Sequence, residues 1–250
     1  MGAKKTTNSN CSGDTQYTIA VRGHKGGTGK STVTMNLAIG FACAGFSVAL
    51  IDLDRQQTSF KILQRRAKLN DPTLARVDYF NCEGINEMYQ LVADLPHEVI
   101  IFDTAGNIGS GMASACLLFC KLVILPFNTS RLDIDTAASV NDILNEVKQD
   151  ANISSFAMAN RLTTHHLRRP RKLQYLKEAF EGLENLPLLE SSFSNREIYT
   201  DSMDESRSVL EFTGKAAEQA GEEVKGLICE ILGIYNSKLA TNKKTVSNNE

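Results

Sequence analysis

The sequence predicts an α/β protein with three layers, in which a mostly parallel, twisted and doubly wound sheet is flanked by helices on both faces. Strand-like and helix-like segments alternate along almost the whole chain. The runs SVALID and EVIIFD are nearly continuous in apolar residues, which is typical of strands buried on both faces. A glycine-rich segment joins the first strand-like run to the first helix-like run. In such a sheet, ligands bind outside the carboxyl ends of the strands.

The individual elements follow from the apolar runs, the periodic segments and the turn residues between them. We expect strands at residues 17–22, 47–52, 75–80, 98–103, 121–126, 154–160 and 186–190. We expect helices at residues 30–44, 57–68, 84–94, 109–119, 132–149, 171–182 and 213–235. The polar leader (1–15) and the polar tail (237–250) lack periodicity and are expected to be flexible, which leaves 16–236 as a single domain.

The composition narrows the class of protein. With 42% hydrophobic and 22% charged residues among 250, the chain resembles an ordinary soluble globular protein. No apolar run approaches the ~18 residues that cross a bilayer, and the first residues lack the apolar core of a secretory signal. The six cysteines form no C-x-x-C pair, so we expect a reducing cytoplasm. Because the net charge is −2, nucleic-acid binding would require a local basic patch.

The glycine-rich segment, VRGHKGGTGKST at residues 21–32, predicts a nucleotide site. Its glycines allow the backbone to approach a phosphate chain closely, and the amino terminus of the following helix adds free amides. Lys30 can then reach the β- and γ-phosphates, and the hydroxyl of Ser31 can coordinate Mg²⁺. We therefore expect a nucleoside triphosphate to be held by Gly26, Gly27, Thr28, Gly29, Lys30, Ser31 and Thr32.

Three aspartates end apolar strand-like runs close to this loop in the expected sheet. Asp52 and Asp54 follow one run, and Asp103 ends another. A carboxylate at the tip of a buried strand is costly unless it faces a cation or a hydrogen-bonding water. Near a phosphate-binding loop, Mg²⁺ and its water shell are the expected partners.

These boxes together resemble those of the ParA/MinD family of ATPases. The general phosphate-loop pattern has glycine where this chain has His24, but Lys25 completes K-G-G-x-G-K-S/T, the deviant Walker A box of that family. IDLDRQQ resembles the Walker A′ box D-x-D-P-Q, with Arg55 in place of proline, and IIFDTAG resembles the Walker B box. VILPFNTSRLD resembles the P-x-x-x-S-x-x-D stretch of the family, to which we assign no chemistry. A later turn resembles G-x-S-V-x-E, with Ser206 in place of glycine.

The resemblance implies a set of roles. Lys25 would reach across a dimer interface to the partner's ATP, Lys30 would hold the phosphates, and Asp54 would position the attacking water, so these three form the expected catalytic set. Ser31, Asp52 and Asp103 would bind Mg²⁺ or its water shell. Asn160, which ends the strand FAMANR, matches the position that hydrogen-bonds adenine.

The densest basic run is HHLRRPRK, residues 165–172. Family members place DNA-binding arginines in this region and after the last strand. A solvated loop and helix face is the alternative explanation of the run. On the DNA interpretation, the contacts would be to phosphates and independent of base sequence. The expected DNA-binding residues are Arg168, Arg169, Arg171, Lys172 and Arg196.

The resemblance implies a ParA-type cycle. ATP binding would form a sandwich dimer, the dimer would bind DNA non-specifically at the nucleoid, and a ParB-like or cargo-adaptor partner would stimulate slow hydrolysis. The cargo would be a plasmid, a chromosome or a protein assembly. The alternative is a MinD-like ATPase, or one that positions chemotaxis clusters or conjugation components. Membrane cycling is not expected, because the tail SKLATNKKTVSNNE lacks an apolar stripe.

Two enzymes of the same fold are disfavoured by single features. An iron-protein reductase needs a cysteine just beyond Asp103, where residues 104–107 are Thr, Ala, Gly and Asn. A tyrosine kinase would have a terminal tyrosine cluster, but only Tyr235 lies near this end of the chain. A biosynthetic ligase such as dethiobiotin synthetase stays open on fold analogy alone.

Overall fold

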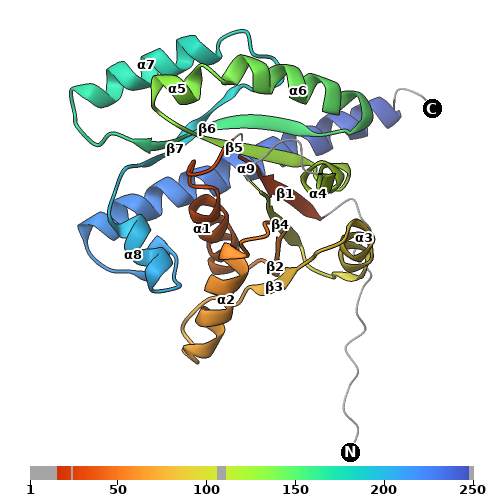
Figure 1. The fold of residues 1–250 in the computed structure, drawn as a ribbon, viewed down its shortest axis with the longest axis vertical. Helices are drawn as coiled ribbons and strands as arrows, with labels where there is room; N and C mark the ends of the chain where they lie inside the picture. Colours follow the sequence, from red (N-terminus) through yellow and green to blue (C-terminus); the bar gives the residue numbers. More distant parts are fainter. Residues whose placement is uncertain (1–15, 24, 106–110, 248–250) are drawn as a thin grey trace, which may run out of the picture.

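The seven expected strands form one sheet in the computed structural model, which describes residues 16–23, 25–105 and 111–247 (Figure 1). The strand order is β3-β2-β4-β1-β5-β6-β7. Every paired strand runs parallel to its neighbour, which confirms the predicted fold class. The leader at residues 1–15 lies outside the described residues. The strands are β1 (Tyr17–Val21), β2 (Val48–Asp52), β3 (Asp78–Asn81), β4 (Val99–Asp103), β5 (Leu122–Asn128), β6 (Ser154–Leu162) and β7 (Leu188–Ser194).

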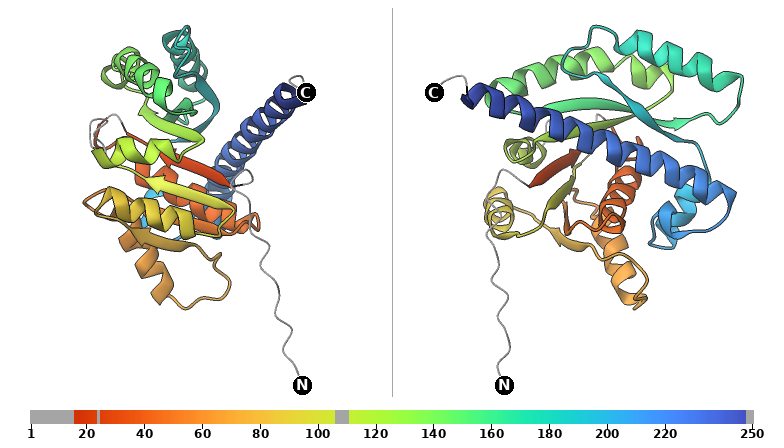
Figure 2. Two further views of the ribbon diagram at one scale, coloured as in Figure 1. Left: turned by 90° about the vertical axis from the view of Figure 1, so that its right-hand side faces the viewer. Right: turned by 180° about the vertical axis from the view of Figure 1, so that it is seen from behind.

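Helices cover both faces of the sheet (Figures 1 and 2), and two separate apolar clusters mark the two faces. One face packs against α1 (Lys30–Cys43), α2 (Thr58–Lys68), α8 (Ile198–Asp204), the 3₁₀ helix η2 (Val209–Glu211) and α9 (Lys215–Ser247). The other packs against α3 (Ile85–Asp94), α4 (Gly111–Ala115), the 3₁₀ helix η1 (Cys116–Leu118), α5 (Arg131–Ile134), α6 (Ala137–Asp150) and α7 (Arg168–Phe180).

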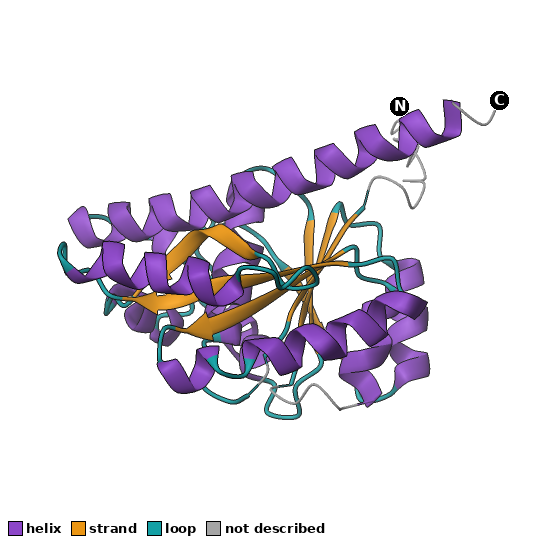
Figure 3. Cartoon of the chain, turned by 90° about the horizontal axis from the view of Figure 1, so that it is seen from above, coloured by secondary structure: helices purple, strands orange, loops and turns teal. Residues whose placement is uncertain are grey.

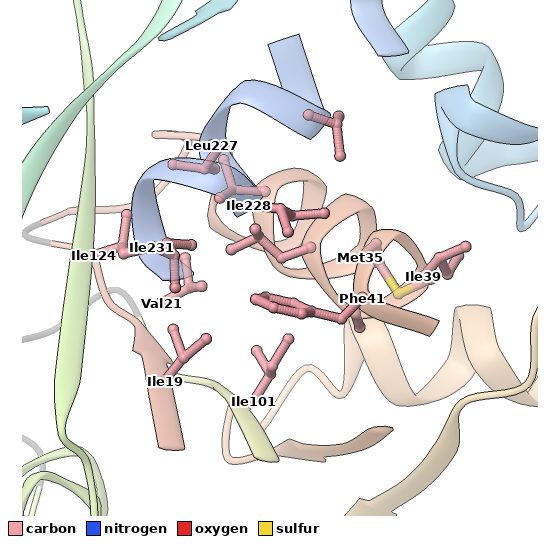
Figure 4. Close-up of a cluster of buried hydrophobic side chains, with 14 of the residues drawn as sticks. Ile19, Val21, Met35, Ile39, Phe41, Ile101, Ile124, Leu227, Ile228 and Ile231 are labelled. Carbon is pink, nitrogen blue, oxygen red and sulfur yellow. The ribbon is translucent and has the colours of Figure 1, made fainter. Parts of the chain in front are cut away.

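The first of these clusters joins α1 and α9 over the centre of the sheet (Figure 4). Phe41 of α1 and Leu227 and Ile231 of α9 lie in this cluster above β1, and each of the three is fully buried. Burying apolar surface of this kind stabilises a fold by about 25 cal/mol per Å². The packing therefore anchors α1, the helix that begins directly after the glycine-rich segment.

The last strand differs most from the prediction. It was expected at 186–190 but runs from Leu188 to Ser194, through the polar sequence ESSFS. The serines are accommodated because their polar groups have partners. The backbone N–H of Ser194 donates to Glu223 of α9, and Arg169 of α7 donates to the hydroxyls of Ser192 and Ser194. The consecutive polar residues of this segment therefore concealed a strand from the sequence analysis, and side chains of α7 and α9 provide the partners of its polar groups.

Three helical regions also differ. Within its described residues, the helix expected at 109–119 is divided into α4 and the 3₁₀ helix η1. The expected helix at 132–149 is divided into α5, which begins after the N-cap Ser130, and α6. Between the two, the hydroxyl of Thr136 donates to the carbonyl of Asp133 (2.6 Å). The short helix α8 was not expected; it buries only two side chains, Tyr199 and Ser202, so it has little periodic signal. All three differences involve helices of fewer than eight residues.

The final helix is longer than predicted and its end projects beyond the sheet (Figure 3). It was expected to end at 235 with a flexible tail from 237, whereas α9 continues to Ser247. Beyond Gly233 the chain has no proline or glycine that would end a helix, and it contains good helix formers such as alanine, leucine and lysine. The backbone of residues 237–247 is therefore helical.

Candidate functional site

The strand register brings the predicted acidic residues to the beginning of the glycine-rich loop. Asp103 of β4 is paired with Val21, the last residue of β1, and also with Asp52, the last residue of β2. The loop at residues 22–29 leaves β1 from this level and enters α1 at Lys30. All three strands end at the same edge of the sheet, next to the central strand, as expected for a doubly wound fold.

The loop needs glycine at three positions for different reasons. Gly27 and Gly29 have φ angles of +79° and +84°, in the left-handed region that side chains disfavour. Gly23 was not predicted; a Cβ there would lie 2.6 Å from Cδ of Lys30 and 3.1 Å from its Nζ. The side chain of Lys30 therefore folds back toward the start of the loop, and it is only 8% exposed.

Two asparagines near the ends of β5 and β6 donate hydrogen bonds to the phosphate loop. These strands lie on the opposite side of β1 from β2 and β4. Asn160 donates from Nδ2 to the carbonyl of Thr28 (2.7 Å), and Asn128 donates from Nδ2 to the carbonyl of Gly27 (3.4 Å). The two asparagines are register partners. A Cβ on Gly29 would lie 2.2 Å from Nδ2 of Asn160, so this glycine also permits close approach. Asn160 was predicted to contact adenine; here its amide positions the loop. Asn128 was missed, although it ends an apolar strand as the aspartates do.

The carboxyl group of Asp103 has two oxygens in different surroundings. Oδ2 accepts a hydrogen bond from the hydroxyl of Ser59 (2.5 Å), while Oδ1 is buried without a hydrogen-bond partner in the described structure. Burial raises the pKa of Asp103 to about 7, and the neighbouring Asp52 contributes. Hydrogen bonds from Ser59 and Ser31 and the charge of Lys30 oppose this rise in pKa. These neighbours offset the cost of burying the Asp103 carboxylate only in part, as expected at a site that binds a cation.

In Asp52, by contrast, both oxygens accept backbone hydrogen bonds. Oδ1 accepts from the N–H of Asp54 (2.9 Å) and Oδ2 from the N–H of Phe60 (3.0 Å). Burial raises the pKa of Asp52, while these two N–H groups act in the opposite direction. Asp52 thus organises the loop between β2 and α2.

Asp54 begins that loop and is half-buried. Its Oδ1 accepts from the backbone N–H of Gln56 (3.0 Å), and its carbonyl accepts from the N–H of Gln57 (2.8 Å). The chain then turns through Gln57, whose φ is +53°. The turn forms with the exposed Arg55 in place of proline, because the aspartate's own side chain supports it.

Lys25 is held within its own subunit. Its Nζ forms an ion pair with Oδ1 of Asp133, whose side chain is 2% exposed while that of Lys25 is 42% exposed. Ser130 donates from its hydroxyl to Oδ2 of the same carboxylate (3.0 Å). Although burial raises the pKa of Asp133, the contacts with Lys25 and Ser130 bring it below its usual value. The P-x-x-x-S-x-x-D stretch, to which no chemistry was assigned, thus supplies the partner of Lys25.

The turn with Ser206 in place of glycine adopts the backbone that glycine would favour. Ser206 has a φ of +58°. Arg66 of α2 donates to its carbonyl (3.2 Å) and forms a buried, bidentate ion pair with Glu211, and Arg65 donates to its hydroxyl (3.3 Å). The following Ser208 caps η2 with a capping box. These contacts join α2 to the start of the carboxyl-terminal helices.

The basic residues predicted to bind DNA fall into two groups. Arg168, Arg171 and Lys172 of α7 line a cavity of about 800 Å³, together with Arg131 of α5, which was not predicted. Lys172 lies over the ring of Tyr175, 5.0 Å from its centroid, and this tyrosine also lines the cavity. We refer to this region, whose other lining residues are Thr129, Asp135 and Thr163, as the cationic cavity.

The other two arginines that were predicted to bind DNA form hydrogen bonds and an ion pair with residues of the same chain. Arg169 donates to Ser194 (2.8 Å) and Ser192 (3.2 Å) of β7. Arg196 forms an ion pair with Glu223 of α9 (3.2 Å) and donates to Gln219 (2.8 Å). Both arginines therefore connect β7 and its following loop to the flanking helices, and their assignment as DNA-binding residues stays a prediction.

The geometry defines a class of protein. A glycine loop that leaves the central strand of an all-parallel sheet, a buried lysine at the start of the next helix and two paired strand-end carboxylates form the site of a phosphate-loop ATPase. None of the helices in the described part of the chain is long and apolar enough to cross a membrane.

The chain belongs to the MipZ ATPase family: the model of ATPase MipZ matches residues 17–173. This confirms the predicted membership of the ParA/MinD group and the assignment as an ATP-hydrolysing enzyme. Among curated proteins, the chain is similar to maintenance of carboxysome distribution protein A of Halothiobacillus neapolitanus. The two are 22% identical over 217 residues, which cover 86% of this chain and 96% of the relative.

Solved structures show the same fold at low identity. MinD from Pyrococcus horikoshii, a septum site-determining protein in complex with Mg-ADP, has a TM-score of 0.62 and 18% identity, covering 88% of this chain and 98% of that one. A plasmid partition protein from Borrelia burgdorferi has a TM-score of 0.56 and 16% identity, covering 77% and 96%. These relatives have three different cargoes or sites of action, so likeness alone does not identify the cargo of this chain.

Proposed function

We propose that this ATPase binds ATP with Mg²⁺, forms an ATP-dependent sandwich dimer and positions cargo on DNA that it binds without regard to sequence. The observation that carries the proposal is the combination of the phosphate loop, whose Lys30 is buried, with the partly exposed Lys25. Lys30 would hold the phosphates, and the glycine-loop amides would cradle them. A partner protein, of the ParB or cargo-adaptor kind, would stimulate slow hydrolysis and so reset the cycle.

The residues present suit Mg²⁺. Oδ1 of Asp103 is a buried carboxylate oxygen without a hydrogen-bond donor in the described structure, and Ser31 lies close enough to affect its pKa. Hard oxygen donors of this kind are the ligands that Mg²⁺ prefers, largely through retained waters. When bound, Mg²⁺ would neutralise charge on the β- and γ-phosphates. Ser31 would bind it directly, and Asp103, supported by Asp52, would hold its waters.

Asp54 fits the task of orienting the attacking water. It lies two residues beyond Asp52 at the site edge and is only half-buried, with its Oδ1 accepting from the backbone N–H of Gln56. Positioning a water matters mainly in the transition state. Asp54→Ala should therefore slow hydrolysis and leave ATP binding intact.

Dimerisation would require Lys25 to exchange partners. In the single subunit its charge is satisfied by Asp133, whereas a role in trans needs it to contact the phosphates of the partner subunit's ATP. The triphosphate carries more negative charge than one carboxylate, which would favour the exchange when ATP is present. The adenine would lie beyond the loop near Asn160, once the partners of that amide rearrange or share its hydrogen bonds.

The cationic cavity supports the DNA part of the proposal. Four cationic side chains from two helices face one hollow with a single carboxylate, that of Asp135. Such a surface attracts phosphate groups and would carry no base information. An aromatic ring under Lys172 would add a face for stacking or for the sugar backbone.

The test combines light scattering with a DNA titration, in ATP, in ADP and without nucleotide, at two salt concentrations. We expect dimers and salt-sensitive DNA binding only with ATP. Lys25→Ala should still bind ATP but fail to dimerise, whereas Asp133→Asn should dimerise at lower ATP concentration because the lysine is released. A wild-type ATP dimer that ignores DNA would instead indicate positioning of protein cargo on another matrix. Normal dimers of Lys25→Ala would make Lys25 an ordinary loop residue.

A further inference from the structure

Ser59 occupies a position that none of the recognised boxes assigns. It is the second residue of α2, it is fully buried, and its hydroxyl donates to Oδ2 of Asp103 at 2.5 Å. The donor and acceptor come from segments 44 residues apart in the sequence. The bond therefore joins the loop after β2 to the end of β4.

The same turn of α2 contacts both strand-end carboxylates. The backbone N–H of Phe60 donates to Oδ2 of Asp52 (3.0 Å), while the neighbouring hydroxyl of Ser59 serves Asp103. Because Asp52 and Asp103 are register partners on adjacent strands, one helical turn holds the pair together. The two contacts differ in one respect: a backbone N–H is available from any residue except proline, but the contact to Asp103 requires a hydroxyl side chain.

The consequence for Asp103 is that its two oxygens are no longer equivalent. With Oδ2 held by Ser59, rotation of the carboxylate about its terminal torsion is opposed, and Oδ1 stays buried without a protein donor. Carboxylates that act on a metal are themselves commonly oriented by such hydrogen bonds. Oδ1 is then the oxygen available to the water shell of a cation beside Ser31.

We propose that Ser59 is a positioning residue of the magnesium site, whose hydroxyl holds one oxygen of Asp103 so that the other accepts from a water bound to Mg²⁺. The inference rests on the proposed role of Asp103 toward Mg²⁺. Ser59 itself touches neither nucleotide nor metal in this arrangement. Its effect should therefore appear in the contribution of Mg²⁺ to nucleotide affinity and not in nucleotide affinity as such.

The experiment measures ADP binding by calorimetry in Mg²⁺ and in EDTA, and takes the ratio of the two affinities as the metal contribution. ADP is chosen because it lacks the γ-phosphate on which dimerisation would depend. In Ser59→Ala we expect the ratio to fall about tenfold, the usual scale for loss of an outer hydrogen bond at a metal site. Affinity in EDTA should stay unchanged. Thr58→Ala, a similar truncation in the same turn, is the matched control and should leave the ratio unchanged.

Asp103→Asn and the double variant show through which residue Ser59 acts. If Ser59 acts by orienting Asp103, the double variant should be no worse than Asp103→Asn alone. An unchanged ratio in Ser59→Ala, with a reduced ratio in Asp103→Asn, would overturn the inference while leaving the proposed metal role of Asp103. An unchanged ratio in Asp103→Asn would overturn both. Additive losses, or a loss of affinity in EDTA, would show that Ser59 acts on the loop as a whole and would also overturn it.

Discussion

The phosphate-loop edge and the cationic cavity both hold charged side chains, but in opposite conditions. At the loop edge, Lys30, Asp52 and Asp103 are almost completely buried, and hydrogen bonds from neighbouring groups hold both carboxylates. In the cavity, Arg131, Arg168 and Arg171 are exposed to solvent. The phosphate-loop edge is thus a preorganised site in which one carboxylate oxygen has no hydrogen-bond partner in the described structure. The cationic cavity is an open surface whose charged groups are accessible to a ligand.

The difference shows where sequence spacing is informative. Buried charges need partners at defined positions, so the strand ends and the loop must occur at definite places in the chain. Exposed cations tolerate many arrangements, so their number in a run says little about which of them face outward. In α7, Arg168 and Arg171 line the cavity while the intervening Arg169 turns to β7.

Removing the buried lysine should produce the largest effect. Lys30→Ala deletes the principal cation of a desolvated cradle, where charge-assisted hydrogen bonds are worth about 1.5–3 kcal/mol each. We expect ATP affinity to fall by about a hundredfold or more, measured by calorimetry. Lys172→Ala, which removes a cation from the open surface, is the control and should leave ATP affinity unchanged. Equal losses of ATP affinity in the two variants would contradict the assignment of the nucleotide site to the phosphate-loop edge.

The burial of Asp103 should appear as a pH dependence of stability in protein free of nucleotide and Mg²⁺. Its folded pKa is raised from 3.8 to about 7, so the folded state retains a proton that the unfolded state loses between these values. Stability from this residue is thus fully present below pH 3.8 and declines as pH rises to 7. Asp103→Asn should remove that decline and gain about 4 kcal/mol over wild type at pH 8, at about 1.4 kcal/mol per pKa unit, with no gain near pH 4. Urea unfolding across this range would measure it; a constant difference would contradict the assignment.

The arginines provide a matched pair of variants with equal loss of charge. Arg168→Ala with Arg171→Ala should weaken ATP-dependent DNA binding about tenfold near 0.1 M salt and reduce the slope of log affinity against log salt by about two. Arg169→Ala with Arg196→Ala should leave this slope nearly unchanged and instead lower the melting temperature, because contacts to β7 and α9 are lost. If both pairs of substitutions reduced the salt dependence of DNA affinity equally, all four arginines would belong to one DNA-binding surface.

The smallest effect is expected at the turn with Ser206. Ser206→Gly relieves the left-handed backbone but loses the hydrogen bond from Arg65 and increases the entropy of the unfolded chain. We expect a change below about 1 kcal/mol in the free energy of unfolding. Ser206→Val, whose branched side chain fits this backbone poorly, should destabilise by about 2 kcal/mol. Similar results for the two variants would indicate that the turn relaxes to another conformation.

Much of the fold and the core of the site follow from the sequence. The seven strands and the phosphate loop were predicted because apolar runs and glycines encode them locally. Asn128 and Ser59 were missed because their importance arises only from strand pairing and from the approach of α2 to β4. The pairing of Lys25 with Asp133 could not be predicted for the same reason, since it depends on how a four-residue helix lies against the loop.

The position of β1 in the sheet also affects the stage of synthesis at which the ATP site can be completed. β1 is the first of the described strands along the chain, but it lies in the middle of the sheet. It can therefore pair only after its neighbours β4 and β5 have been synthesised. The hydrogen bond from Asn160 to Thr28 spans 132 residues, and that from Tyr235 to Thr18 spans 217. Contacts of such long range slow folding and leave an incomplete chain with exposed strand edges. A growing chain on the ribosome therefore lacks the Asn160 contact that positions the phosphate loop until β6 has emerged.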